Sequence, residues 1–560
     1  MESDVGFESS VWVCRKRYRA VLTGWHFKWT ELDKNNRDKK TVLVPVSEVI
    51  GVEQGRLQIL PRKSVEDTEK DFTVFYVNRS TSGGSLWQLG RIQFTCLSRT
   101  LRDQWTEHLR TALKTHGPLR PHKLLVFINP FGGKKKGRQI YHSVVAPVFE
   151  LAGISSHVIV TERAHQARDY LLKKNLTGFD GVVCVGGDGM FSELLHGLIG
   201  RTQQEAGLCE NDPAVTLQPC PLHIGIIPAG STDCVCYATV GVIDPLTSAL
   251  HIVIGDSQPL DVCSVHHASA IVRYSVSLLG YGFYGDVLAE SEKHRWMGPL
   301  RYDISGSLVY LRNRSYAAKV EYLPADPLLS SPRDKTRCLS GCRVCSRSTE
   351  RLFPNHSDSS SLSSSRFSQT STDSEGEWVT VEGRFRCVAL TCMSSSCARS
   401  PLGLSPSAHL ADGTGDLILV WDTHPLGFLK FLYRHTSTED QFDLPFVEVH
   451  RVKAVRFSLP KVSEEQKQEE FSELRGADEV ESGYLDNGSQ QSLLQRDTRH
   501  QETDEQKTFL CGLCCNKTAA SVWNCDGEIL SFKEILCKVH AQLVCLYARG
   551  IEEAAIRNCI

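Results

Sequence analysis

The segment of residues 180–193, DGVVCVGGDGMFSE, constrains the fold of this chain more than any other. Its VVCV run at 182–185 is typical of a central parallel strand, and a helical pattern follows it. Asp188 stands in the turn between them, where backbone amides and the positive end of a helix dipole favour an anionic partner. Three glycines of the turn lack a Cβ atom, so that a ligand can approach the backbone closely. The glycines concerned are Gly186, Gly187 and Gly189.

Two other segments repeat this pattern of apolar strand, glycine turn and helix. Residues 123–134 read KLLVFINPFGGK, and residues 223–233 read HIGIIPAGSTD. In an open parallel sheet, the loops at the carboxyl ends of the strands lie along one edge, where ligands bind. The three turns therefore predict a cradle for a polyphosphate, although each turn could also serve only the fold. None of them has the spacing of a P-loop or of a dinucleotide-binding G-x-G-x-x-G motif.

Composition limits the classes of protein to consider. A chain of 560 residues exceeds one hydrophobic core, so we expect two or three domains. The formal net charge of −2 gives no reason to expect a nucleic-acid partner. The sequence has no run of about 18 uninterrupted apolar residues, and its start, with Glu2 and Asp4, lacks the pattern of a secretory signal. We therefore expect a cytoplasmic protein whose membrane contact is peripheral.

The 21 cysteines, without a secretory signal, indicate reduced thiols rather than a disulfide framework. Cys338, Cys342 and Cys345 stand apart, because their C-x-x-x-C-x-x-C spacing lies in a polar linker. Three thiolates so close together could share a zinc ion, and free thiols are the alternative. A zinc site would need a fourth ligand from elsewhere in the chain. The candidates are Cys387, Cys392 and Cys397.

The first part of the chain, residues 1–117, predicts a small antiparallel β-barrel closed by a helix. Short alternating runs fill residues 11–95, and residues 100–114 carry apolar side chains at helical spacing. This order resembles a pleckstrin-homology (PH) domain. Its first turn is basic and could attract anionic phosphoinositide headgroups, with a solvated strand face as the alternative. The basic residues are Arg15, Lys16, Arg17 and Arg19.

Residues 122–256 predict a doubly wound α/β nucleotide domain. Strands recur at Leu124, Ser156, Gly181 and His223, with helical periodicity between them, and this alternation specifies a parallel sheet covered on both faces.

Residues 257–560 predict a mainly antiparallel β-sandwich domain, because β runs dominate there and helical patterns are few. A serine-rich tract at about 330–376 and a Glu-, Gln- and Asp-rich tract at about 462–507 interrupt it. Neither can bury enough apolar surface to offset its ordering entropy, so both are predicted to be disordered inserts. The Asp526-Gly527 pair is typical of a tight hairpin turn.

The three glycine motifs, in this order, resemble the diacylglycerol-kinase catalytic-domain family, which includes the sphingosine and ceramide kinases. Residues 227–237, 278–286 and 521–528 are most similar to the ceramide kinases. The resemblance implies an ATP- and Mg²⁺-dependent lipid kinase that phosphorylates the primary hydroxyl of ceramide to give ceramide 1-phosphate. Diacylglycerol or sphingoid-base kinase activity, or a non-catalytic membrane-binding adaptor with a kinase fold, are the alternatives.

The resemblance also assigns roles to residues. Asp188 would accept the proton of the lipid hydroxyl as the catalytic base, although its loop position would also suit orientation or metal contact. The lipid headgroup would lie against Gly186, Gly187, Asp188, Gly189 and Asp286. Asp526 and Glu528 would help to hold magnesium. The residues expected to bind ATP are Asn129, Pro130, Phe131, Gly132, Gly133, Thr161, Glu162, Arg163, Ala164, His165, Glu193, Ser231, Arg295, Arg301, Asp526, Gly527 and Glu528.

Two further points follow from the resemblance. Arg295 and Arg301 stand where sphingosine kinases have phosphate-clamping arginines, although a solvated helix face is also open for them. Sphingosine kinases carry a second Asp for the amine of their substrate, and Leu288 takes that position here, which suits a neutral lipid.

The segment of residues 425–435, PLGFLKFLYRH, is basic and amphipathic. Such a segment can bind in a calmodulin groove, which would bring Ca²⁺ regulation, or lie on a membrane, and a core helix end is equally compatible. The plasma membrane or the Golgi would be the membrane visited.

Overall fold

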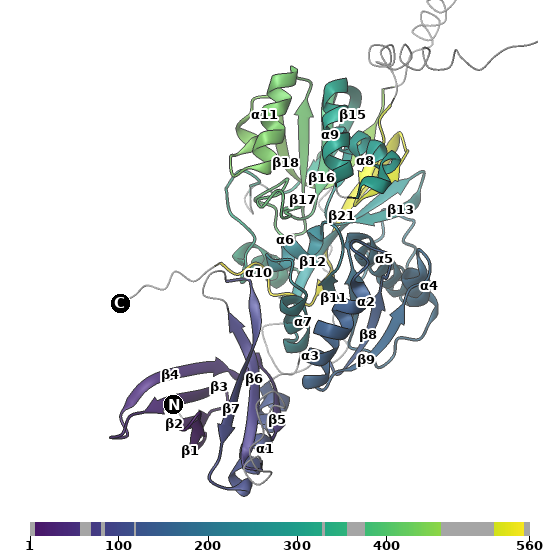
Figure 1. Cartoon of the computed structure of the whole chain (residues 1–560). Coiled ribbons are helices and arrows are strands. Elements are labelled where there is room, and N and C mark those ends of the chain that lie inside the picture. The colour runs from purple at the N-terminus through teal and green to yellow at the C-terminus, as the bar shows by residue number, and fades with distance from the viewer. Residues whose placement is uncertain are drawn as a thin grey trace, which may run out of the picture.

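The computed structural model describes residues 6–55, 69–79, 84–116, 119–298, 300–326, 331–354, 376–460 and 520–553. Three regions follow one another along the molecule (Figure 1): an N-terminal β-barrel, a central α/β layer and a β-rich region that carries its own helices. The structure describes the two predicted inserts to different extents. Residues 331–354 are ordered and include α10 (Arg343–Leu352), so the expectation of disorder is wrong there. The remainder of that insert, at 355–375, and the whole of 462–507 lie outside the described residues.

The N-terminal region has the predicted β-strands and closing helix. Its seven strands are antiparallel, in the order β4-β3-β2-β1-β7-β6-β5. Apolar residues at helical spacing place Trp105 and Leu109 in the core of the barrel, where Trp105 stacks with Phe72. The elements are β1 (Phe7–Val13), β2 (Lys16–Leu22), β3 (His26–Leu32), β4 (Asp38–Pro45), β5 (Val49–Gln54), β6 (Asp71–Arg79), β7 (Trp87–Thr95) and α1 (Arg99–His116).

The central region is the predicted parallel sheet, in the order β11-β10-β8-β9. Helices α3 and α7 cover one face and α4 to α6 the other, so that each face is buried in its own hydrophobic cluster. Its elements are β8 (Lys123–Ile128), α2 (Gly137–Ile140), a π-helical turn (Tyr141–Val145), α3 (Ala146–Leu151), β9 (Ser155–Val160), α4 (Gln166–Lys173), β10 (Gly181–Gly186), α5 (Asp188–Glu205), β11 (His223–Pro228), α6 (Cys234–Val240) and α7 (Pro245–Ile254).

The third region is mainly antiparallel, as predicted. Its long strands β16 and β18 each change partner half-way: β16 pairs first with β15 and then with β17, and β18 joins the same two strands. These four strands therefore close on themselves. The strands are β12 (Gln258–His267), β13 (Ala270–Ser275), β14 (Leu279–Gly282), β15 (Tyr316–Pro324), β16 (Val379–Thr391), β17 (Gly415–Trp421), β18 (Val447–Ser458), β19 (Trp523–Cys525), β20 (Glu528–Leu530) and β21 (Glu534–Leu546).

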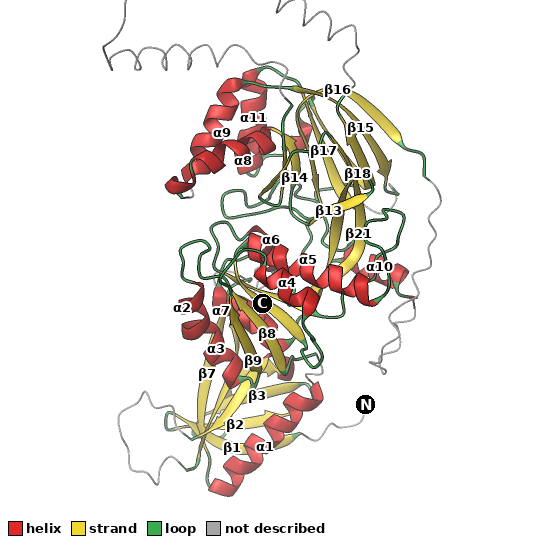
Figure 2. Cartoon of the chain, turned by 90° about the vertical axis from the view of Figure 1, so that its right-hand side faces the viewer, coloured by secondary structure: helices red, strands yellow, loops and turns green. Residues whose placement is uncertain are grey.

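This region has more helical structure than its sequence indicated. Helices α8 (Phe283–Lys293), α9 (Leu300–Arg312) and α11 (Pro425–Thr436) gather at its far end (Figure 2). Phe428 and Phe431 of α11 are buried against the strands. Among the described residues, no single helix is long and apolar enough to cross a membrane. Helices α6 and α7 together have the necessary length and composition, but they are bent by 59° relative to each other.

Strand β21 joins the second and third regions into one sheet. It pairs antiparallel with β12 and β18, and its end meets β11 in parallel at Ile224 and Leu546. One hydrophobic cluster accordingly contains side chains of both regions, such as Val182, Val262 and Leu543. The division into two domains, at 122–256 and 257–560, therefore stays a prediction from the sequence.

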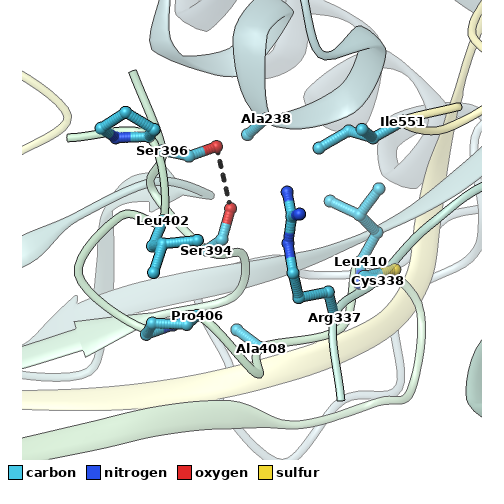
Figure 3. A pocket seen from close by; sticks show the side chains of 11 residues that line it. Ala238, Arg337, Cys338, Ser394, Ser396, Leu402, Pro406, Ala408, Leu410 and Ile551 are labelled. Carbon is cyan, nitrogen blue, oxygen red and sulfur yellow. Dashed lines mark hydrogen bonds between the residues drawn. The ribbon is translucent and has the colours of Figure 1, made fainter. Parts of the chain in front are cut away.

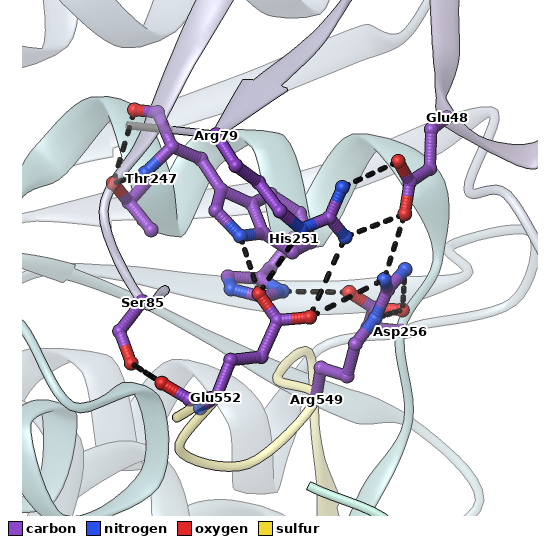
Figure 4. Close-up of polar contacts among 9 residues, drawn as sticks. Glu48, Arg79, Ser85, Thr247, His251, Asp256, Arg549 and Glu552 are labelled. Atoms are coloured by element: carbon purple, nitrogen blue, oxygen red, sulfur yellow. Dashed lines mark hydrogen bonds and ion pairs between the residues drawn. The ribbon is translucent and has the colours of Figure 1, made fainter. Parts of the chain in front are cut away.

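The residues after β21 attach the N-terminal region. Glu552 accepts hydrogen bonds from the Trp87 indole (2.7 Å) and, at its main-chain oxygen, from Ser85 (2.8 Å). The backbone amide of Trp87 also donates to Thr247 Oγ1 of α7 (3.1 Å), and its ring lies 3.8 Å from that of His251. Figure 4 shows these contacts among three distant parts of the sequence.

An ionic network surrounds the same junction. The Glu48 carboxylate is 7% exposed and accepts from Arg79 (2.6 Å) and Arg549 (2.9 Å), while Arg549 also binds Asp256 (2.9 Å). Burial opposes ionisation of Glu48, but the two guanidinium groups outweigh it and lower its pKa. The ion pairs of Glu48 therefore stabilise the folded protein above the unfolded pKa of this residue. Their contribution is lost as the pH falls through the lowered pKa of Glu48 in the folded state.

We predict that Arg549→Met loosens the junction. The substitution leaves the buried Glu48 and the half-buried Asp256 carboxylates with one cation fewer, which should cost about 2–3 kcal/mol of unfolding free energy. Thermal unfolding at pH 7 measures this, and hydrogen exchange at β7 localises it. Arg19→Met is the matched control, because the Arg19–Asp38 pair is exposed and should contribute less than about 0.5 kcal/mol. Equal shifts for the two variants would contradict the prediction.

Candidate functional site

The three glycine turns converge, as their positions in a parallel sheet predict. A Cβ atom at Gly133 would lie 2.5 Å from the Ala229 carbonyl oxygen, and one at Gly187 would lie 2.9 Å from Gly230 Cα. Side chains cannot occupy these positions without displacing backbone, so the glycines are needed for the close approach. The turns after β8, β10 and β11 therefore form one continuous surface at the carboxyl edge of the sheet.

Asp188 lies at the start of α5, within this surface. Its carboxylate accepts hydrogen bonds from the backbone amides of Cys234 (3.1 Å) and Val235 (3.0 Å), the first residues of α6. Burial raises its pKa, and the two amides oppose this shift in part. Asp188 thus caps α6 and ties the second turn to the third.

Asp233 is a second acid at this point, which the sequence analysis did not assign to the site. It has a positive φ of 52° and is 5% exposed, and its carboxylate accepts from the Gly230 amide (2.9 Å). Burial, and then repulsion from Asp188, raise its pKa to about 6. Its place at the end of the PAGSTD motif was the available signal.

Hydrogen bonds from backbone amides to side-chain oxygens hold the first turn and the loop at 161–165 in shape. Asn129 Oδ1 accepts from the amides of Phe131 (2.9 Å) and Gly132 (3.1 Å), which shapes the first turn. The Glu193 carboxylate accepts from the His165 amide (2.9 Å) at the start of α4. Thr161 is buried, whereas the side chains around the turns face solvent. The exposed residues are Phe131, Glu162, Arg163, Ala164, His165, Ser231 and the lysines Lys134, Lys135 and Lys136.

The hairpin of β19 and β20 returns to this site. Asp526 and Gly527 form its two-residue turn with positive φ values of 47° and 87°, as the sequence predicted. The Asp526 carboxylate accepts from the amides of Val276 (2.8 Å), Ser277 (3.0 Å) and Leu278 (2.7 Å). It also accepts from the Ser275 hydroxyl (3.0 Å).

Two contacts link the hairpin to the glycine turns. The Ser277 hydroxyl lies 3.3 Å from the Cys234 sulfur at the start of α6. Glu528 pairs with Arg273, whose guanidinium donates to Ser192 Oγ of α5 (3.2 Å). No motif marked Arg273 in the sequence. Protein donors contact both carboxylates in this arrangement, so a magnesium ion would compete with them, and the metal role of Asp526 and Glu528 stays a prediction.

Asp286 and the two arginines lie in the third region. Asp286 accepts from the hydroxyls of Tyr316 and Ser521 and lines a small pocket with Phe283 and Phe428. Burial raises its pKa. Arg295 and Arg301 share Glu292 as their carboxylate partner. Their expected contact with phosphate stays a prediction.

The cysteine cluster is present, but its fourth member is a histidine. Cys338, Cys342 and Cys345 gather around His409, with one ligand atom from each residue, all within 4.8 Å of one another. The expected candidates point elsewhere: Cys387 lies in the core beneath α11, and Cys392 lies among the β strands. Cys397 faces Ser400 in an isolated bridge. His409 follows no cysteine spacing, so the sequence pattern could not identify it.

The comparisons define the class first. The diacylglycerol kinase catalytic domain model matches residues 123–265, so the fold and the glycine turns belong to a kinase of that type. Models of the ceramide kinase PH domain and of the ceramide kinase C-terminal domain match residues 7–109 and 345–559. The chain belongs to the ceramide kinase family.

Full-length relatives agree with the family models. Ceramide kinase of Homo sapiens is 43% identical over 557 residues, covering 98% of this chain and 97% of the relative. Ceramide kinase of Mus musculus is 43% identical over 569 residues, with 97% and 98% covered. A diacylglycerol kinase structure from Bacillus anthracis is 13% identical, with a TM-score of 0.43 over 76% of this chain and 97% of that one.

We predict that Asp233→Asn changes the pH dependence of stability. Because the folded pKa of Asp233 is about 6, the native state holds an extra proton between about pH 4 and pH 6. Stability therefore falls as the pH rises through this window, and the asparagine variant escapes the loss. Relative to the wild type, the variant should gain about 2 kcal/mol between pH 4 and pH 7.

Urea unfolding across this pH range measures the gain. The exposed Asp103→Asn variant controls for the removal of one negative charge. Parallel pH profiles for the wild type and Asp233→Asn would refute the assignment.

Proposed function

We propose that this chain transfers the γ-phosphate of ATP to the primary hydroxyl of ceramide, giving ceramide 1-phosphate and ADP. The observation that carries the proposal is the convergence of three glycine turns at Asp188, in a chain of the ceramide kinase family. The close packing of Gly133, Gly187 and Gly230 brings the three turns together, and Gly189, with nothing within 4 Å of where its Cβ would stand, leaves open space for phosphate groups at the N-terminus of α5. That helix end favours anions through its free amides and its dipole.

Proton transfer to Asp188 is compatible with its capping contacts. Each carboxylate oxygen accepts one amide hydrogen bond from α6 and keeps a second lone pair for another donor. The lipid oxygen would attack the γ-phosphorus while the bond to the bridging oxygen of ADP breaks, and the hydroxyl proton would pass to Asp188. Burial raises the pKa of Asp188, which makes this carboxylate a better proton acceptor than an ordinary aspartate.

Cations are needed to balance the charge of the nucleotide. The exposed Lys134, Lys135 and Lys136 flank the first turn and would approach the phosphates. Magnesium bound with ATP would neutralise further phosphate oxygens. Arg295 and Arg301 would contribute after leaving Glu292.

A neutral lipid fits the third region. Leu288 is buried and offers no charge for an amine, and the Asp286 carboxylate is already satisfied by two hydroxyls. An amide-linked lipid alcohol meets these conditions, as does diacylglycerol, so preference for ceramide rests on the family.

Membrane contact would be peripheral, through the PH domain and the lipid substrate. In the first turn, Lys16 and Arg19 pair with Glu31 and Asp38, whereas Arg17 donates to the neutral Ser10 and Asn36. Arg17 and the exposed Arg15 are therefore the residues best placed for phosphoinositides. The plasma membrane or the Golgi would be the membrane that the protein contacts.

Helix α11 would be the segment that binds calmodulin. Helix α11 buries Phe428 and Phe431, the aromatic anchors that a calmodulin groove would take. Its exposed side chains, Leu426, Leu429 and Tyr433, suit a lipid surface as well. Calcium dependence would require α11 to leave the core.

We predict that Asp188→Asn lowers kcat by about 10²–10⁴-fold with little change in the KM for ATP, because only proton acceptance is lost. Asp180→Asn is a matched control: Asp180 also accepts two backbone amides, from His122 (2.6 Å) and Lys123 (2.8 Å), but at the opposite end of β10. The control should keep its activity. Turnover of Asp188→Asn above about a tenth of the wild-type rate would rule out Asp188 as the catalytic base.

The substrate is tested with radiolabelled ATP and ceramide, diacylglycerol or sphingosine in mixed micelles. We expect ceramide to be phosphorylated at the highest kcat/KM. A preference for diacylglycerol or sphingosine would identify that lipid as the substrate and leave the proposed mechanism unchanged. Absence of turnover with all three lipids, while ATP still binds, would favour the non-catalytic adaptor.

A further inference from the structure

We propose that Cys338, Cys342, Cys345 and His409 bind one structural zinc ion, which cross-links the segment around α10 to the core of the kinase. The three cysteines come from residues 338–345 and the histidine from the loop before β17, so the ion would join segments about 65–70 residues apart. This inference is independent of the proposed lipid substrate.

The geometry fits a tetrahedral zinc site. With Zn–S and Zn–N bonds of about 2.3 and 2.0 Å, neighbouring ligand atoms in a tetrahedron lie about 3.5–3.8 Å apart. Cys338 Sγ and Cys345 Sγ are 3.6 Å apart, and Cys342 Sγ lies 3.3 Å from His409 Nδ1. The sulfur atoms are too far apart for a disulfide, and all three cysteines are free.

The surroundings favour a structural site over a catalytic one. Four protein ligands leave no open position for water or substrate, as in structural zinc sites. Cys345 and His409 are buried, and the Leu410 amide points at Cys338 Sγ (3.5 Å), a second contact typical of metal-bound thiolates.

The site lies where several regions meet. Cys338 packs with Leu410 and Ala238 of α6 in the main hydrophobic cluster. Figure 3 shows Cys338 beside a small pocket that Ala238, Leu410 and Ile551 line from different parts of the chain. The Ser340 amide donates to the Ile551 carbonyl (2.9 Å). A zinc ion here would fix both the C-terminal segment and α6, the helix that Asp188 caps.

Metal analysis of the purified full-length chain tests the proposal. We expect about one zinc per chain after expression under reducing, metal-replete conditions. Zinc content should fall at least about tenfold in Cys342→Ser and His409→Ala. The exposed Cys209→Ser and His142→Ala variants are matched controls and should keep their zinc. A wild type without zinc, or a His409→Ala variant that retains it, would overturn the site.

Cobalt substitution of the wild type tests for the metal site without a variant that has to fold. Co²⁺ in the wild type should give thiolate charge-transfer bands and the intense visible bands of a tetrahedral site. His409→Cys should bind the metal as a four-cysteine site with a shifted spectrum, whereas an unshifted spectrum would exclude His409. Chelation of zinc should lower the thermal midpoint of the wild type but not that of the Cys342→Ser variant. Equal thermal midpoints for the wild type with and without zinc would exclude the cross-linking role.

Discussion

The return of the C-terminal strand is the interaction on which the rest of the structure depends. Strand β21 pairs with β12 along most of its length and with β18 over its first residues, and it reaches β11 at its end. At the bulge in β12, the buried Asp261 accepts from the amides of Gln542 (2.7 Å) and Gly413 (2.6 Å), which fixes the register of the two strands. Without this strand, the parallel sheet would end at β11 and expose its edge.

The same return organises the site. Residues 523–530 precede β21, so the register of β21 also places the hairpin that carries Asp526. Most acids near the glycine turns accept backbone amides: Asp188 from α6, Asp233 from its own turn and Glu193 from the start of α4. These bonds hold the loops in shape before any ligand binds. Such preorganisation lowers the cost of binding a charged nucleotide, because the donors need not reorient at that moment.

The sequence could predict what depends on local pattern. Strand and helix periodicity defined the parallel sheet, and glycine positions located the edge at which the turns meet. The Asp526-Gly527 hairpin followed from turn chemistry alone. Contacts between residues distant in sequence had no such signal. The pairing of Glu528 with Arg273 depends on strand register, which a single sequence does not specify. The approach of His409 to the cysteines depends on how its loop packs against the segment around α10.

The ordered segment at 331–354 shows a different limit. Its serine, lysine and arginine residues have the composition of a linker, yet Cys345 is buried and Thr349 exchanges hydrogen bonds with Gln542 of β21 (2.9 and 3.1 Å). A short segment with few apolar residues can be ordered when a small number of specific contacts replace a hydrophobic face. Composition counts apolar side chains and does not register such contacts.

A continuous set of contacts connects the PH domain to the catalytic edge. Trp87 binds Glu552, the adjacent Ile551 binds Ser340, and Cys338 packs with Ala238 of α6, whose first amides bind Asp188. Contiguity alone does not make this an allosteric route, since coupling requires an element with two populated arrangements. These contacts are instead satisfied and at least half-buried, so their physical effect is to restrict the position of α6. Proton transfer depends on the placement of one carboxylate to within a fraction of an ångström, and a helix fixed at both ends supplies that placement.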